Sequence, residues 1–167
     1  MDHDQYRLEL KIIQKEIFGL LSKNKFIRNK SKFLYRQQND IVCVIDLQKS
    51  DYSFFYYLNI GIWFNAIRAY PVCAPYKCPL DIRATSIPEI KENCHDVLLN
   101  QLLDVEKCFT VHGVPTNLAN RVEKIKEIFD ETLLPFLDKL SLSFLRHEYA
   151  KKWFHVAKDA ISLFREN

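Results

Sequence analysis

The feature that most constrains the fold is the stretch from Ile41 to Phe64, which has the pattern of two β-strands joined by a turn. In its first half, the odd positions are all apolar: Ile41, Cys43, Ile45 and Leu47. In its second half, the even positions are apolar: Phe54, Tyr56, Leu58, Ile60 and Ile62. Alternation with a period of two, in β-branched and aromatic residues, is typical of strands that place one face against a core. We therefore predict a β-hairpin that turns near residues 49–52.

The apolar faces of the two arms also predict a pairing register. A two-residue turn at Ser50-Asp51 joins apolar residues in four pairs: Leu47 with Phe54, Ile45 with Tyr56, Cys43 with Leu58, and Ile41 with Ile60. A slip of one residue would turn half of these side chains toward water. We therefore expect this register in the folded chain.

The opposite face of the hairpin is polar and aromatic. Its candidate binding residues are Asp46, Gln48, Tyr57, Asn59 and Trp63, joined by Arg83 from a further strand in which Leu80, Ile82 and Ala84 alternate with Asp81, Arg83 and Thr85. Gly61 leaves room on this face for a side chain or ligand to approach the backbone. Amide, guanidinium and aromatic groups that point one way suit a polar ligand or the loop of a partner protein. The alternative is that they are structural groups that satisfy one another.

Apolar residues at helical spacing predict helices at both ends of the chain. The N-terminal stripe is Tyr6, Leu10, Ile13, Ile17 and Leu20 with Leu21. A long helix begins after Asn117, with the stripe Leu118, Val122, Ile125, Phe129 and Leu133, and we expect Pro135 to kink or end it. A last helix carries Trp153, Phe154, Ala157, Ile161 and Phe164. The prediction is a single α+β domain over residues 1–167, in which an antiparallel sheet of about four strands packs against N-terminal and C-terminal helices.

Composition excludes several classes of protein. The chain has 167 residues, which suits one domain, and its 3 glycines form neither of the common glycine-rich phosphate-binding motifs. No apolar run approaches the length of a membrane span, and the start of the chain lacks an apolar signal core. Its 5 cysteines, an odd number, indicate reduced thiols. We therefore expect a cytoplasmic protein that does not enter the membrane.

Three other chemistries have candidate residues in the chain. Zinc would need Cys73-x4-Cys78, Cys94-His95 and Cys108-x3-His112, whose spacing is loose, so we expect no metal and no cofactor. A cysteine nucleophile with a histidine base has no local signature here, so we predict no catalytic residues. The basic run from Lys23 to Arg36 carries aromatic residues that suit nucleic acid, but the net charge is only +3.

Two short motifs resemble a known family. Residues 45–50, Ile-Asp-Leu-Gln-Lys-Ser, followed by residues 57–62, Tyr-Leu-Asn-Ile-Gly-Ile, resemble the "LQKS … NLGI" core of the bacterial domain-of-unknown-function family 4304. Arg83 resembles the motif that follows, and residues 134–137 resemble the family's C-terminal helical segment, so the resemblance spans roughly residues 12–140. The turn of this hairpin looks shorter than the Ser/Gly-rich loop of the family. The resemblance implies an α+β fold and no assigned activity.

These observations predict a non-catalytic cytosolic domain that binds a protein partner, such as a toxin-neutralising protein of the immunity type. One alternative is an enzyme, or a binder of a small polar ligand, at the polar sheet face. The other is a weak nucleic-acid-binding protein that uses the basic run: Lys23, Lys25, Arg28, Lys30 and Lys32. The sequence does not specify the oligomeric state.

Overall fold

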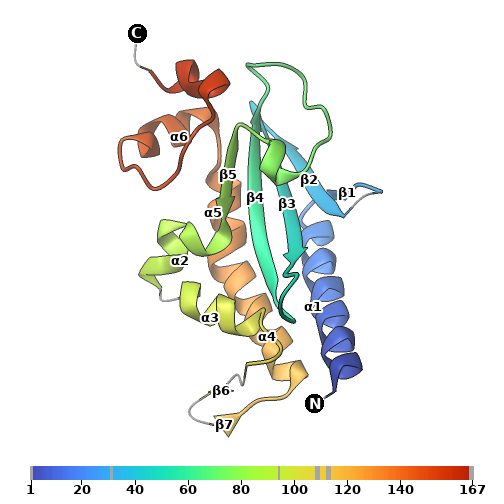
Figure 1. The fold of residues 1–167 in the computed structure, drawn as a ribbon. Helices are drawn as coiled ribbons and strands as arrows, with labels where there is room; N and C mark the ends of the chain where they lie inside the picture. The colour runs from blue at the N-terminus through green and yellow to red at the C-terminus, as the bar shows by residue number, and fades with distance from the viewer. Residues whose placement is uncertain (1, 31, 94, 108–109, 112–113, 166–167) are drawn as a thin grey trace.

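The computed structural model describes residues 2–30, 32–93, 95–107, 110–111 and 114–165 (Figure 1). Its centre is an antiparallel five-stranded sheet with the strand order β1-β2-β3-β4-β5. The strands are β1 (Ile27–Arg28), β2 (Phe33–Gln38), β3 (Ile41–Lys49), β4 (Tyr56–Phe64) and β5 (Leu80–Arg83). The predicted α+β fold is confirmed, with five strands where we expected about four.

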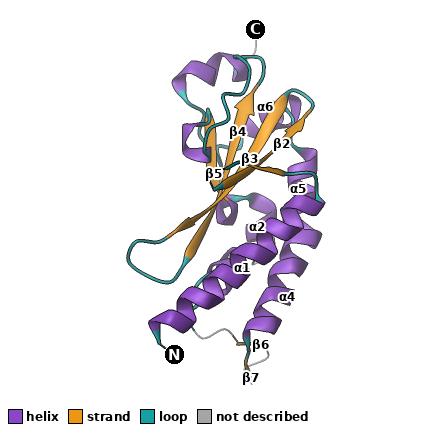
Figure 2. Cartoon of the chain, turned by 90° about the vertical axis from the view of Figure 1, so that its right-hand side faces the viewer, coloured by secondary structure: helices purple, strands orange, loops and turns teal. Residues whose placement is uncertain are grey.

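Helices cover one face of this sheet (Figure 2). They are α1 (His3–Lys23), α2 (Pro88–Glu92), α3 (His95–Leu102), α4 (Leu118–Ile128), α5 (Leu134–Lys139) and α6 (Leu142–Tyr149). A separate pair of short strands, β6 (Thr110–Val111) and β7 (Val114–Pro115), precedes α4, and a 3-10 helix at Lys158–Phe164 ends the described chain. No helix among the described residues is long and apolar enough to span a membrane.

The N-terminal helix forms as its sequence predicts. Asp2 begins it, because its side chain accepts a hydrogen bond from the backbone nitrogen of Gln5 at 2.9 Å. The buried face of α1 then carries Leu10, Ile13, Ile17, Phe18 and Leu21. These side chains join one core cluster with the odd-numbered apolar residues of β3 and the even-numbered residues of β4. The helix therefore packs on the apolar face of the hairpin.

The hairpin itself exists, but the predicted register is wrong. Leu47 pairs with Leu58 and Ile45 with Ile60, each four residues further along the second arm than predicted. Because four is an even number, every side chain still points to the predicted face.

Contacts with a distant segment explain the longer turn. Phe54 and Phe55 do not pair with β3; they lie against residues 103–105 instead. The Val105 nitrogen donates to the Phe54 oxygen at 3.0 Å, and the Tyr56 nitrogen donates to the Leu103 oxygen at 3.0 Å. Phe55 keeps one bond to the turn, in which the Ser50 nitrogen donates to its oxygen at 2.8 Å, but its bridge partner is Asp104 rather than a residue of β3.

The C-terminal third departs from the predicted helices in two places. Asn117 caps α4 as expected, accepting from the Asn120 nitrogen at 3.0 Å, but Pro135 does not end the helix. A π-helical turn at Phe129–Leu133 precedes it, and Pro135 falls in the first turn of α5, where its missing N–H matters least. The predicted last helix is also wrong, because Trp153 and Phe154 lie in an irregular segment between α6 and the final 3-10 helix.

Glu148, buried at the end of α6, gives the fold a dependence on pH. Burial raises the pKa of its carboxyl, but hydrogen bonds from Lys151 at 2.7 Å and from the Trp153 indole at 3.2 Å lower it below its ordinary value. A carboxyl whose pKa is lower in the folded state stabilises the fold above its unfolded pKa, and this contribution is lost as the pH falls through the folded pKa. Wild type should therefore be more stable than Glu148→Gln at pH 7, and the difference should shrink below the ordinary pKa of 4.5.

Urea titrations between pH 7 and about pH 3 measure this difference. Glu127→Gln is the matched control, because Glu127 is exposed on α4 and pairs only with Lys124 among the described residues. If the stability difference between wild type and Glu148→Gln stays constant over the whole pH range, the pKa of Glu148 is not lowered in the folded state.

Candidate functional site

The structure places all six predicted site residues on the sheet face that the helices do not cover. Asp46, Asn59 and Arg83 are direct neighbours across β3, β4 and β5, because Asp46 pairs with Asn59 and Asn59 pairs with Arg83. Gln48, two residues further along β3 than Asp46, pairs with Tyr57. The sequence interpretation therefore brought these five residues together correctly, although it assumed a different register.

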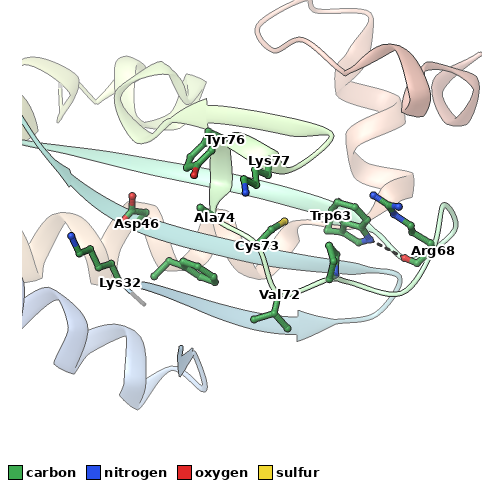
Figure 3. A pocket seen from close by; sticks show the side chains of 11 residues that line it. Lys32, Asp46, Trp63, Arg68, Val72, Cys73, Ala74, Tyr76 and Lys77 are labelled. Atoms are coloured by element: carbon green, nitrogen blue, oxygen red, sulfur yellow. Dashed lines mark hydrogen bonds between the residues drawn. The ribbon is translucent and has the colours of Figure 1, made fainter. Parts of the chain in front are cut away.

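A loop divides this face into two parts. Residues 65–79 leave the end of β4 and cross back over the sheet before β5 begins (Figures 1 and 3). Gly61 allows the crossing: a Cβ atom at this position would lie 2.5 Å from the Pro75 Cα and 2.8 Å from the Cys78 Sγ. The expectation that Gly61 admits a close neighbour is met by the chain's own Pro75.

Trp63 anchors the loop to the sheet. Its indole nitrogen donates to the Arg68 oxygen at 2.8 Å, and its ring lies 6.0 Å from the ring of Tyr70. Tyr70 in turn contacts the ring of Tyr35 at 5.5 Å and donates its hydroxyl to the Cys73 oxygen at 2.6 Å. The side chain of Trp63 is 3% exposed, so its first role is structural.

The part of the face that the loop leaves open is a polar patch, which we call the open patch: Gln48, Tyr57, Asn59 and Arg83. The Asn59 side-chain nitrogen donates to the Gln48 side-chain oxygen at 3.0 Å, in an exposed hydrogen bond. The Arg83 guanidinium lies over the ring of Tyr57, 4.0 Å from its centroid. The patch therefore presents an arginine held over an aromatic ring beside a pair of amides.

The second part of the face is a hollow between the loop and the sheet, which we call the loop pocket (Figure 3). Its volume is about 660 Å³. Its described lining combines charged, aromatic and small apolar side chains: Lys32, Phe33, Asp46, Trp63, Arg68, Pro71, Val72, Cys73, Ala74, Tyr76 and Lys77. In Figure 3, Lys32 and Asp46 lie at one end of the pocket and Arg68 lies at the other.

Positive charge dominates this pocket. Three cationic side chains, Lys32, Arg68 and Lys77, face one carboxylate among the described lining residues, that of Asp46. Burial raises the pKa of Asp46, against the lowering effects of the Leu47 backbone hydrogen bond and of Lys32. The Arg68 guanidinium lies 5.2 Å from the centroid of the Trp63 ring, and the Lys77 amine lies 5.8 Å from the ring of Tyr76.

The thiols of this region are placed differently from one another. Cys73 is half-buried and lines the pocket, whereas Cys78, near the end of the loop, is buried. Burial raises the pKa of the Cys78 thiol, and the neighbouring Cys73 raises it further.

Within the described residues, no group of three or more His, Cys, Asp or Glu side chains is placed to hold a metal ion. The predicted zinc alternatives at Cys94, Cys108 and His112 lie outside the described residues.

Sequence reasoning missed the loop's contribution to the site. Lys32 belonged to the basic run, but Arg68, Tyr76 and Lys77 fall in a segment that contains Pro71, Pro75 and Pro79 and for which the sequence predicts no strand or helix. The one local signal was Gly61, which marked a close approach to the sheet without identifying the approaching residue.

The comparisons with known proteins identify one family. The family model described as "Domain of unknown function (DUF4304)" matches residues 20–139. No curated protein and no solved structure gives a significant match. The matched range holds the whole five-stranded sheet, the open patch and the loop pocket, and it covers well over half of the chain. The chain therefore belongs to the domain of unknown function family DUF4304.

Proposed function

We propose that this protein is a non-catalytic domain that binds a protein partner through the uncovered face of its sheet. The observation that carries the proposal is the open patch, where Arg83 is held over Tyr57 and Asn59 is hydrogen-bonded to Gln48 on a face that no α-helix of the described residues covers. Arginine and tyrosine are enriched among the residues that contribute most to protein interfaces. Side chains already held in one arrangement lose less entropy when a partner binds.

Exposure distinguishes this patch from a buried structural network. Gln48 and Arg83 are exposed, and Tyr57 and Asn59 are half-buried. Removing one member of such an exposed pair costs little stability, because water replaces the lost partner. Truncation of these exposed side chains should therefore change the stability of the fold little, whereas a binding role predicts a large loss in the capture of a partner.

The chemistry of the patch supports binding over catalysis. Its groups are amides, a phenol and a guanidinium, which recognise hydrogen-bonding groups and charge at ordinary pH.

The loop pocket is the observation that favours the alternative of a small polar ligand or substrate, because its volume falls within the range of small-molecule sites.

A toxin-neutralising role of the immunity type, in a bacterial cytoplasm, is the specific form of protein binding that we propose. Such a role requires only that the domain cover a surface of another protein, and it requires no catalytic step from this chain. Fold and family do not assign a partner, so this form of the proposal rests on the surface alone.

The basic run supports nucleic-acid binding less well. Of its aromatic residues, Phe26 and Phe33 are buried, which leaves their rings unable to stack on bases. Phe26 instead lies beneath Arg36, whose guanidinium carbon is 4.7 Å from the ring centroid. Arg36 also pairs with Asp138 at 2.8 Å.

Arg83→Ala should abolish capture of the native partner and leave the fold intact. The expected change in the free energy of unfolding is below about 1 kcal/mol, because the guanidinium is exposed. Tagged wild type and variant would be used to capture proteins from the native lysate, and mass spectrometry would identify a protein that wild type retains and Arg83→Ala loses. Lys139→Ala is the matched control, because it removes an exposed cation from the helical side.

Asn59→Ala extends the same test to the amide pair. If all patch variants capture the same proteins as wild type, the proposed surface is wrong. The same conclusion follows if the patch variants lose about 1–3 kcal/mol of stability, the cost of leaving a buried polar partner unsatisfied, and still capture the partner.

A further inference from the structure

We propose that the loop pocket receives an acidic segment of the partner protein, in which a Glu or Asp side chain stands next to a large apolar one. This inference rests on the proposed function, since it identifies the part of the partner that enters the pocket beside the open patch. The expected ligand of the pocket is therefore a negatively charged peptide segment.

The positive charge of the pocket is unpaired among the described residues. Some cations elsewhere in the described chain are paired with carboxylates, such as Arg36 with Asp138, Lys126 with Glu123 and Lys151 with Glu148. Within the described residues, Lys32, Arg68 and Lys77 form no ion pair. These three side chains surround one hollow, so a ligand that carries negative charge gains from several cations together.

Arg68 is held in position although it is exposed. Its backbone oxygen accepts the hydrogen bond from the Trp63 indole at 2.8 Å, and its guanidinium lies over the same indole ring. A guanidinium fixed by stacking keeps its planar fork free for two hydrogen bonds to one carboxylate. Arg68 is therefore the residue that we expect to bind the ligand's carboxylate.

The pocket lining also has an apolar part. Phe33, Pro71, Val72 and Ala74 contribute apolar surface between the charged residues. A free phosphate or a nucleic-acid backbone would leave this surface against water, whereas an apolar side chain next to an acidic one would cover it. The combination favours a peptide segment over a bare anion.

Asp46 sets the orientation of this ligand. It lies at the opposite end of the pocket from Arg68 (Figure 3), and its negative charge repels an acidic group placed near Lys32. We therefore expect the acidic side chain near Arg68. Removal of the Asp46 charge should strengthen the binding of an acidic ligand, which is a change that loss of folding cannot produce.

The test uses the tryptophan already in the pocket as its reporter. The chain has 2 tryptophans, and Trp153 lies in the C-terminal aromatic cluster beside Phe136 and Phe154. In the full chain with Trp153→Phe, emission therefore reports on Trp63 alone. The probes are the capped peptide acetyl-Leu-Glu-Phe-Glu-Leu-amide and its counterpart with Gln in place of both Glu residues.

The Glu peptide should change the Trp63 emission in a saturable way, and the Gln peptide should bind at least about tenfold more weakly, since it lacks the charge that the cations attract. Arg68→Glu should weaken the binding of the Glu peptide by about tenfold or more, because it places like charges together. Asp46→Asn should strengthen it. Lys139→Glu changes the net charge by as much as Arg68→Glu does, but away from the pocket, and should have little effect.

Several outcomes would overturn the inference: no saturable change with the Glu peptide, equal binding of the Gln peptide, or equal weakening by Lys139→Glu and Arg68→Glu. Inorganic phosphate that displaces the peptide at equal concentration would overturn it as well, because the pocket would then be a site for anions in general. If Arg83→Ala abolishes partner capture but Arg68→Glu does not, the pocket inference fails and the proposed function stands. If both variants capture normally, the proposed function fails too.

Discussion

Replacement of Gly61 with alanine should lower the free energy of unfolding by about 2–3 kcal/mol, the cost of overpacking a site that cannot relax. The new Cβ would lie 2.5 Å from the Pro75 Cα and 2.9 Å from the Pro75 oxygen. Both atoms are backbone, so the loop must move away from the sheet. Urea denaturation measures the loss, and Trp63, which anchors the loop, should become more accessible to a fluorescence quencher.

Gly19→Ala is the matched control within the same chain. Gly19 lies within the C-terminal half of α1, and a Cβ built on it meets no heavy atom within 4 Å. Alanine is the better helix former by about 0.5–1 kcal/mol, so this variant should be more stable than wild type. The two Gly-to-Ala changes should therefore have opposite signs. If Gly61→Ala is as stable as wild type, the loop does not lie on the sheet at this point.

Arg121→Met should lower the free energy of unfolding by about 3 kcal/mol or more, because it leaves several buried carbonyls without a donor. Arg121 is 5% exposed. Its guanidinium donates to the backbone oxygens of Gln101 at 2.6 Å, Leu102 and Asp104 at 3.0 Å, and Lys107 at 3.0 Å. The end of α3 and the segment that follows it are thus held by one side chain from α4.

Lys124→Met, on the same helix, is the control for Arg121→Met. Lys124 forms an exposed ion pair with Glu127, and such pairs contribute less than about 1 kcal/mol. Arg121→Lys keeps the positive charge but loses the planar fork of donors, because an amine cannot reach carbonyls on both sides as a guanidinium does. We expect it to remain well below wild type in stability. Full stability of the lysine variant would show that charge alone matters at this position.

The sequence predicted the faces of the hairpin but not its register, and the reason is physical. Alternation of apolar and polar residues distinguishes only shifts of odd length, since an even shift returns each side chain to its face. The true register depends on Phe54 and Phe55, which leave the ladder to contact residues 103–105. That choice is made by a segment about 50 residues away, and no local pattern of the hairpin contains it.

The candidate site was predictable to the same extent. Strand alternation placed Gln48, Tyr57 and Asn59 together, and the neighbouring strand brought Arg83 beside Asn59. The loop pocket was not predictable, because the path of residues 65–79 depends on tertiary contacts. Trp63 lies on the polar face, as the alternation predicted, but the pattern did not predict that its indole would hold the loop in place.

The helical end of the chain shows a second kind of limit. A proline in a helical pattern predicts a kink or an end, yet the π-helical turn at Phe129–Leu133 lets the helical path continue to Lys139. Trp153 and Phe154 have helical spacing with Ala157 and Ile161, but their rings pack against Phe136 and Phe164 from irregular backbone. Apolar spacing alone does not separate these two arrangements.

The most direct test of the central proposal, that the uncovered sheet face binds a protein partner, is a footprint of the captured partner on this chain. Hydrogen–deuterium exchange followed by mass spectrometry compares the free chain with the complex, segment by segment. We expect slower exchange in the loop at residues 65–79 and in β5 around Arg83, with unchanged exchange along the exposed sides of α1 and α4. Protection confined to the helical side, with the loop and β5 unaffected, would contradict the account.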